Sequence, residues 1–223
     1  MAEVLDLRAV AGRIGDHIVL DRHRQVDDGS GHAGSLCDSG AVVRLYLVRH
    51  GKAAASFSEA PNPGLDATGT TQAEAMAERL APLGPLPIVT SPLKRTRDTA
   101  APLEKRWRFT ARIEPAVGEI PSPMEDPAAR GEWLRGVMAS VWSAQPEDLK
   151  LWRQDVAGAL LALQRPTVVV THFVAINVAV GIAEGDDRVV SFAPDNCSVT
   201  VLDVEDGALR LVRRGVERAT QVL

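Results

Sequence analysis

TVVVT, the stretch at residues 167–171, holds three consecutive valines between two threonines and predicts a strand that is buried on both faces. RLYLV (44–48) is another short apolar run, which meets a turn at Gly51, and it predicts a second buried strand. PIVTS (87–91) predicts a third strand. Strands that are apolar on both faces belong to mostly parallel sheets with helices on each side. These runs therefore indicate an α/β protein.

Helical patterns separate the predicted strands. In TGTTQAEAMAERLAPLG (68–84) the apolar residues recur at the spacing of one helix face, and we expect Thr68 to cap this helix. The remaining predicted elements are helices at 93–107, 127–145, 147–164 and 174–183, an edge strand at 109–115, and a terminal hairpin at 198–214 that turns at Asp206–Gly207. This alternation predicts one domain, a three-layer α/β/α sandwich with a mostly parallel sheet.

The N-terminal 40 residues differ from the rest of the chain. They carry seven acidic and four basic residues and lack hydrophobic periodicity, so we expect residues 1–40 to be a flexible extension and 41–223 to be the folded domain. A true start of translation near Val42 or Val43 is a second interpretation of the same segment. The first residues lack the basic and long apolar parts of a secretion signal, so we expect no export.

Composition excludes several functional classes. The chain has 223 residues, of which 45% are hydrophobic and 24% charged, as in a soluble protein with one sizeable core. Its formal net charge of −4 argues against a nucleic-acid partner, and no apolar run is long enough to span a membrane. Cys37 and Cys197 match no metal-ligand spacing and no disulfide framework. This cysteine usage predicts a cytoplasmic location.

Polar residues directly follow three of the predicted strands: Arg49-His50-Gly51, the segment from Ser91 to Arg95, and Thr171-His172. Because ligands of open α/β sheets bind beyond the carboxyl ends of the strands, we expect these clusters to converge on one crevice. Guanidinium groups offer forked donors that match phosphate oxygens. A neutral imidazole among them can accept a phosphoryl group. The pattern therefore predicts a site for phosphoryl transfer.

Four segments in order carry a family resemblance: RLYLVRHGKA (44–53), TSPLKRTRDTA (90–100), VGEIPSP (117–123) and VVVTHFVAINVAVG (168–181). Together they resemble the histidine phosphatase superfamily, whose best-known branch is the cofactor-dependent phosphoglycerate mutases. The resemblance implies a phosphoglycerate mutase-like fold. It also implies a catalytic domain at 41–223 with the activity of a histidine-type phosphatase, a phosphoric monoester hydrolase.

The resemblance implies a role for each of five residues. His50 would be the nucleophile that forms a phosphohistidine, and Arg49 and Arg95 would bind the phosphoryl oxygens. His172 would bind the same oxygens and stabilise charge in the transition state. Glu119 would protonate the leaving alcohol and then activate water. This set needs no metal and no other cofactor, since fixed cations can perform most of the catalysis of phosphoryl transfer.

Departures from the family pattern favour hydrolysis over mutase chemistry. Mutases usually continue after R-H-G with Glu or Gln, Thr and a nearby Asn, whereas this chain has KAAAS at 52–56. Phe173 and Asn177 stand where Gly and Arg are frequent. We therefore expect a phosphomonoester hydrolase that acts on a small phosphorylated metabolite. The alternatives are a phosphoglycerate mutase-type phosphotransferase and a non-catalytic phosphate-binding protein.

The sequence leaves three points open: the acid residue, the segments that select the substrate, and the oligomeric state. Glu125 and Asp126 are rivals of Glu119 for the acid role, because all three carboxylates lie in one proline-rich stretch. We expect the loop 52–65 and the insertion 118–150, which could act as a lid, to set the choice of substrate. A homodimer is also left open, since related proteins are a weak guide to oligomeric state.

Overall fold

The computed structural model describes residues 42–55 and 62–218, and the expected N-terminal extension at 1–40 lies outside these ranges. Six strands form one sheet in the order β3-β2-β4-β1-β5-β6. Their bounds are β1 Val43–Arg49, β2 Ile88–Thr90, β3 Arg112–Ile113, β4 Thr167–Thr171, β5 Val199–Glu205 and β6 Ala208–Arg213. The pairs β1–β4, β2–β4 and β2–β3 are parallel, and the hairpin β5–β6 adds antiparallel pairs at one side. The predicted mostly parallel sheet is confirmed.

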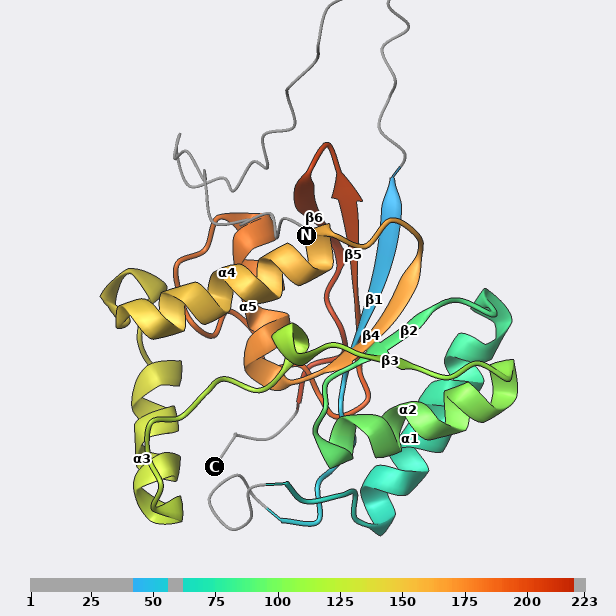
Figure 1. Cartoon of the computed structure of the whole chain (residues 1–223), viewed down its shortest axis with the longest axis horizontal. Coiled ribbons are helices and arrows are strands. Elements are labelled where there is room, and N and C mark those ends of the chain that lie inside the picture. The colour runs from blue at the N-terminus through green and yellow to red at the C-terminus, as the bar shows by residue number, and fades with distance from the viewer. Residues whose placement is uncertain (1–41, 56–61, 219–223) are drawn as a thin grey trace, which may run out of the picture.

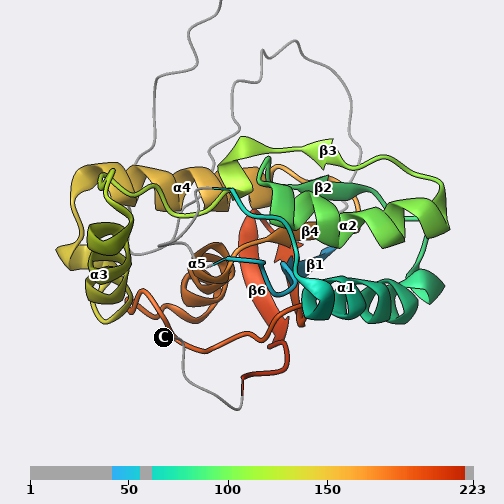
Figure 2. The same ribbon diagram turned by 90° about the horizontal axis from the view of Figure 1, so that it is seen from below.

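Helices cover both faces of this sheet (Figure 1). Their bounds are α1 Ala67–Leu80, α2 Lys94–Trp107, α3 Pro127–Met138, α4 Glu147–Leu161 and α5 Phe173–Glu184. Seen from below, α1 and α2 lie on one side of the strands, and α3, α4 and α5 lie on the other (Figure 2). The predicted three-layer sandwich is therefore confirmed. Within the described ranges, none of the helices combines the length and the apolarity that crossing a bilayer requires.

The strands divide their side chains between two cores. Leu45, Leu47 and Val169 pack with the buried residues of α4 and α5, whereas Val48 and Val168 pack with those of α1 and α2. This alternation follows from the two-residue period of a strand. Because both faces are buried, the central strands read as continuous apolar runs in the sequence.

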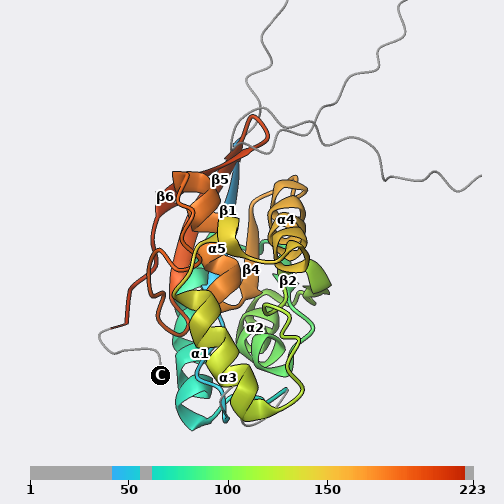
Figure 3. The ribbon, with the colours of Figure 1, turned by 90° about the vertical axis from the view of Figure 1, so that its left-hand side faces the viewer.

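The β5–β6 hairpin lies beside α5, on the opposite side of the molecule from α2 (Figure 3). Asp206 and Gly207 make its turn with φ values of 51° and 73°. Positive φ at both central residues is what a two-residue turn between right-twisted strands requires. The prediction of a hairpin that turns at these residues is confirmed.

Two predicted helix boundaries are wrong. The cap of α1 is Asp66, whose side chain accepts a hydrogen bond from Gly69 N, instead of Thr68. The helix expected at 127–145 ends at Met138. Its continuation leaves the helical path because Trp142 N donates to Asp187 O and Ser140 O accepts from Val189 N. These partners are distant in sequence, so local periodicity carries no sign of them.

Candidate active site

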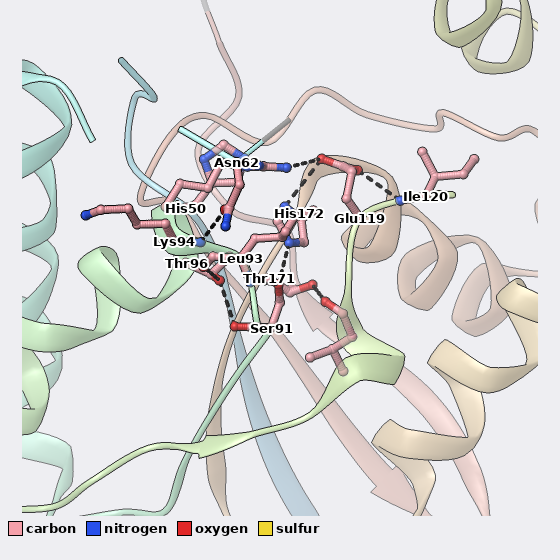
Figure 4. Close-up of polar contacts among 12 residues, drawn as sticks. His50, Asn62, Ser91, Leu93, Lys94, Thr96, Glu119, Ile120, Thr171 and His172 are labelled. Carbon is pink, nitrogen blue, oxygen red and sulfur yellow. Dashed lines mark hydrogen bonds and ion pairs between the residues drawn. The ribbon is translucent and has the colours of Figure 1, made fainter. Parts of the chain in front are cut away.

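The three polar clusters meet at the carboxyl ends of adjacent strands. Arg49, the last residue of β1, pairs in register with Thr171, the last residue of β4. On the other side of β4, Thr90 ends β2 opposite Val170. His50, Ser91 and His172 follow these strand ends directly and are buried (Figure 4). The expected convergence of the clusters is therefore observed.

His50 is held in one tautomer by its own backbone. Its Nδ1 lies 2.8 Å from the carbonyl oxygen of Gly51, which can only accept, so Nδ1 carries the proton. Nε2 is then unprotonated, and its lone pair accepts a hydrogen bond of 3.3 Å from Nε of Arg95. Burial, reinforced by the charges of His172, Arg95 and Arg49, holds the pKa of His50 well below its usual value. A neutral imidazole whose Nε2 carries no proton is the form that can act as a nucleophile.

The helix α1 begins close against this backbone because two glycines meet there. A Cβ on Gly51 would lie 2.7 Å from the carbonyl oxygen of Gly69, and a Cβ on Gly69 would overlap the backbone of Lys52. The same close approach lets the amide of Lys52 donate to Gln72 and its ammonium group pair with Asp66 at 3.0 Å. Any larger residue at Gly51 would push α1 away from the nucleophile.

His172 is oriented in the opposite sense to His50. Its Nε2 lies 2.8 Å from Oγ of Ser91, so Nδ1 is the nitrogen that faces the site. Nδ1 lies 3.3 Å from Oε2 of Glu119, which is close enough for an ion pair but is not an aligned hydrogen bond. Burial lowers the pKa of His172, and the Glu119 carboxylate opposes that shift. Nδ1 is therefore a buried polar atom that an incoming oxygen could satisfy.

Arg49 is a buried cation with capacity to bind an anion. Its Nη1 donates to Pro194 O at 2.9 Å, and its guanidinium lies 5.1 Å above the centre of the Phe173 ring. Among residues 42–55 and 62–218, no hydrogen-bond partner reaches its Nε. Burial, with the nearby charge of Arg218, lowers the pKa of Arg49 to about 9. The Phe173 ring forms a cation–π contact with Arg49.

Arg95 and Glu119 join the two histidines. Nη2 of Arg95 lies 3.1 Å from Oε2 of Glu119, and both side chains are largely buried. Burial alone would raise the pKa of Glu119, but the charges of His172 and Arg95 outweigh it and hold that pKa far below its usual range. Glu119 is therefore an ionised carboxylate in the absence of substrate.

The loop that carries Glu119 is tied to the end of β4. Oγ1 of Thr171 donates to the carbonyl oxygen of Val117 at 2.6 Å, and Ile120 N donates to Oε1 of Glu119 at 3.2 Å. Of the rival carboxylates, Asp126 caps α3 by accepting from Ala129 N, and Glu125 is exposed. The structure thus brings Glu119, and neither rival, into contact with the other predicted site residues.

Three of these side chains could in principle ligate a metal. One nitrogen or oxygen from each of His50, Glu119 and His172 lies within 4.8 Å of the other two. However, the guanidinium group of Arg95 contacts both His50 and Glu119, and Arg49 is also close enough to influence the charge of His50. Two fixed cations favour an anion at this centre over a metal cation. The arrangement suits a phosphate group, whose oxygens Arg49, Arg95 and Nδ1 of His172 can bind together.

Sequence reasoning missed several residues that shape the site. Ser91 was grouped with its neighbours, but its contact with His172 was not foreseen. Asn62 accepts a hydrogen bond of 2.7 Å from Lys94 N at the start of α2, next to His50 in Figure 4. Asn177, on α5, binds Ser191 N and Phe192 N through its side-chain oxygen. The sequence marks Asn177 as a departure from the family pattern and Ser91 as a residue that follows a strand, but it gives no sign of their contacts. The N-P-G stretch around Asn62 carries a turn signal.

Comparisons with known proteins agree with this geometry. A family model described as Histidine phosphatase superfamily (branch 1) matches residues 45–217. The chain is 31% identical over 120 residues to the glucosyl-3-phosphoglycerate phosphatase of Mycobacterium tuberculosis, a match that covers 52% of this chain and 50% of that protein. The chain spans half or less of the length of the curated relatives that it matches.

Solved structures share the fold. A mycobacterial glucosyl-3-phosphoglycerate phosphatase matches with a TM-score of 0.59 at 22% identity, over 79% of this chain and all of that one. A phosphoserine phosphatase from Entamoeba histolytica, in complex with 3-phosphoglyceric acid, matches with a TM-score of 0.62 at 20% identity, over 79% and 98% of the two chains. At these identities the likeness establishes a common architecture.

Proposed function

The chain belongs to the histidine phosphatase superfamily, and we propose that it hydrolyses the phosphomonoester of a small metabolite through a phosphohistidine at His50. The observation that carries the proposal is the state of His50. Its Nδ1 proton is committed to Gly51 O, and its Nε2 lone pair lies beside Arg95. The names of relatives add support, since one matched protein is a glucosyl-3-phosphoglycerate phosphatase and one similar structure a phosphoserine phosphatase.

In the first step the phosphoryl group passes to His50. Arg49, Arg95 and Nδ1 of His172 bind the non-bridging oxygens of the substrate, which carry most of the charge in the transition state. Nε2 of His50 forms a bond to phosphorus as the bond to the ester oxygen breaks. The imidazole ring becomes positively charged, and the hydrogen bond from Nδ1 to Gly51 O stabilises that charge.

Glu119 supplies the proton for the leaving group. Its pKa is low in the free protein because His172 and Arg95 are close. A phosphate dianion bound among the same cations offsets their charge and adds repulsion, so the pKa of Glu119 rises and the carboxyl group takes up a proton from solvent. That proton goes to the departing ester oxygen.

Hydrolysis completes the cycle. The Glu119 carboxylate takes a proton from a water molecule, whose oxygen bonds to phosphorus as the bond to Nε2 of His50 breaks. Inorganic phosphate leaves and His50 returns to its neutral form. Each step uses only side chains of this chain and water, so the proposal includes independence from metals.

Hydrolysis is preferred to mutase chemistry because of the segment that follows Gly51. A mutase must retain its product for phosphoryl return, which needs polar contacts to the rest of the substrate. Here Lys52 is engaged with Asp66, and alanines occupy 53–55. Residues 56–61 of the expected specificity loop lie outside the described ranges. We further propose the cytoplasm as the compartment, since the described cysteine, Cys197, is free and buried.

The proposal is tested by phosphate release from an aryl phosphate between about pH 5 and about pH 8, in the presence of a chelator. We expect wild type to release phosphate without a bisphosphate primer, and His50→Ala to lose about 10⁴-fold in kcat. The matched control is Arg97→Gln, an exposed position on α2 that should leave kcat unchanged. A folded wild type that releases no phosphate, or release that persists in His50→Ala, would overturn the proposal.

A further inference from the structure

The segment after β6, residues 214–218, packs against the loop 193–196, which contacts Arg49 and His50. Val216 O accepts a hydrogen bond from Asp195 N at 2.8 Å, and Arg218 N donates to Ala193 O at 2.9 Å. Pro194 and Glu217 form a bridge between the same two segments. Pro194 O is also the acceptor for the guanidinium of Arg49. The end of the described chain is therefore built onto the loop that supports the catalytic centre.

Asn196 connects this loop to His50. Its Nδ2 donates to the carbonyl oxygen of His50 at 2.8 Å. Nη2 of Arg218 donates to Oδ1 of the same amide at 3.1 Å. A guanidinium group can only donate and a carbonyl oxygen can only accept, so the amide of Asn196 has one orientation that satisfies both partners. Arg218 thereby determines which end of the amide faces His50.

The carbonyl group that Asn196 holds belongs to the peptide between His50 and Gly51. The N–H of that peptide donates to Oγ1 of Thr99 at 2.9 Å, so the peptide plane is held at both ends. The next carbonyl oxygen, that of Gly51, accepts from Nδ1 of His50 at 2.8 Å. Rotation of the held peptide would move this acceptor and with it the imidazole ring.

We propose that Arg218 and Asn196 are positioning residues that hold the nucleophilic Nε2 of His50 in line with the phosphoryl group. The inference deepens the proposed function and rests on it. Arg218 acts on His50 through Asn196 and two successive hydrogen bonds. Its ion pair with Asp195 is longer, at 3.7 Å, and Asp195 is 45% exposed, so the contact with Asn196 is the stronger determinant of its position.

The first test removes the donor from Arg218. In Arg218→Met we expect kcat for an aryl phosphate to fall by about 10-fold to about 100-fold with KM nearly unchanged, as for loss of an outer partner of a catalytic group. Added ethylguanidinium should restore part of the lost kcat. Arg214→Met is the matched control on the same segment, because Arg214 pairs with Glu184 instead. It should lose no kcat and show no rescue.

The second test replaces the amide of Asn196 by a carboxylate and so removes the N–H donor to His50. Asn196→Asp places a carboxylate oxygen against the carbonyl oxygen of His50, so kcat should fall at least as far as in Arg218→Met, and ethylguanidinium should not restore it. A rise in KM with unchanged kcat in Arg218→Met would overturn the proposal and make Arg218 a substrate-binding residue. A lower melting temperature with full kcat per folded molecule would also overturn it, because the contact would then serve stability alone.

A third measurement separates this inference from the proposed function. Nitrogen NMR of the His50 ring in the ligand-free protein reports the fraction of the tautomer with Nδ1 protonated. We expect that fraction to be near complete in wild type and in Arg214→Met, and reduced in Arg218→Met. If wild type proved unable to hydrolyse phosphate esters, this readout would still decide the positioning role. Identical ring signals in all three proteins would refute it.

Discussion

The two parts of the site differ in how they are held. The strand-end region, residues 49–51, 91–95 and 171–173, lies at the carboxyl ends of β1, β2 and β4. Its predicted site residues Arg49, His50, Arg95 and His172 are at most 8% exposed. The Glu119 loop, residues 117–126, is tied to the sheet through Thr171 and becomes exposed after Ile120. In the proposed mechanism the strand-end region binds the phosphoryl group common to all phosphomonoesters, and we expect the loop to contact the part of the substrate that varies.

This difference has a physical basis. A phosphoryl group has one shape and charge, so its partners can be fixed by a buried sheet and lose little entropy on binding. The leaving group differs between substrates, and exposed loops tolerate sequence change at a low cost in stability. We therefore expect the strand-end region to control the rate on every substrate and the Glu119 loop to control the rate on some.

Among variants that test this comparison, the largest effect should come from the residue that joins the two regions. Arg95 donates to both His50 and Glu119, so Arg95→Met should lower kcat/KM for an aryl phosphate by about 10³-fold, as for loss of a donor to the transition state. Arg97→Met, on the exposed face of α2, is the control and should keep full activity. Retention of more than about a tenth of wild-type kcat/KM in Arg95→Met would contradict the assignment.

A smaller effect, and one that separates the regions, is expected from Glu119→Gln. The variant cannot supply a proton, so kcat for an alkyl phosphate should fall by about 10²-fold or more. An aryl phosphate with a good leaving group needs less protonation, so its phosphoryl transfer should slow far less. Glu125→Gln is the matched control on the exposed part of the loop. Equal losses on both substrates would remove Glu119 from the acid step.

Stability should depend on pH in two separate windows. His50 stays neutral in the folded protein, whereas in the unfolded chain it binds a proton below its ordinary pKa of 6.5. The free energy of unfolding should therefore fall as the pH drops below 6.5, by up to about 1.4 kcal/mol per pH unit for His50. His172, whose pKa burial also lowers, adds to the fall in the same window. Glu119, with a lowered pKa, should lose its contribution only as the pH drops below 4.5.

Urea unfolding of wild type and two variants checks these windows. His50→Gln should make the fall that begins at 6.5 less steep and leave the share that comes from His172, whereas Glu119→Gln should flatten the fall that begins at 4.5. The charges that face His50 come from Arg49, Arg95 and His172, and both variants retain these residues. Identical pH profiles in the three proteins would show that these groups do not titrate as the buried geometry requires.

The smallest effect should come from the tie between the regions. Thr171→Val keeps the shape of the side chain and removes the hydrogen bond of 2.6 Å to Val117 O. The free energy of unfolding should fall by about 1 to about 3 kcal/mol, because the buried carbonyl group loses its partner. If the tie positions Glu119, turnover of an alkyl phosphate should also fall more than turnover of an aryl phosphate. Thr70→Val, at an exposed position on α1, is the control.

Much of the fold could be predicted from local patterns. The apolar runs in β1, β2 and β4 were recognisable because both faces of these strands are buried. The end of α3 was not, because it depends on two hydrogen bonds with distant residues. Trp142 N donates to Asp187 O, and Ser140 O accepts from Val189 N. The cap of α1 was predicted at Thr68 and lies at Asp66, because Thr and Asp both suit the N-cap position and local sequence does not decide between them.

For the site, the sequence by itself determined which chemical groups are available and that they follow strand ends. Because R-H-G, the Ser91–Arg95 segment and T-H each follow a predicted strand, the sequence was enough to predict that Arg49, His50, Arg95 and His172 lie together. Only the tertiary structure decided which nitrogen of each histidine faces the substrate. That choice rests on hydrogen bonds across the sheet, from Ser91 to His172, and on the backbone around His50, which Asn196 holds from 146 residues away. Such contacts form only when the partner atoms are placed to within a few tenths of an ångström. The local order of residues does not encode that placement.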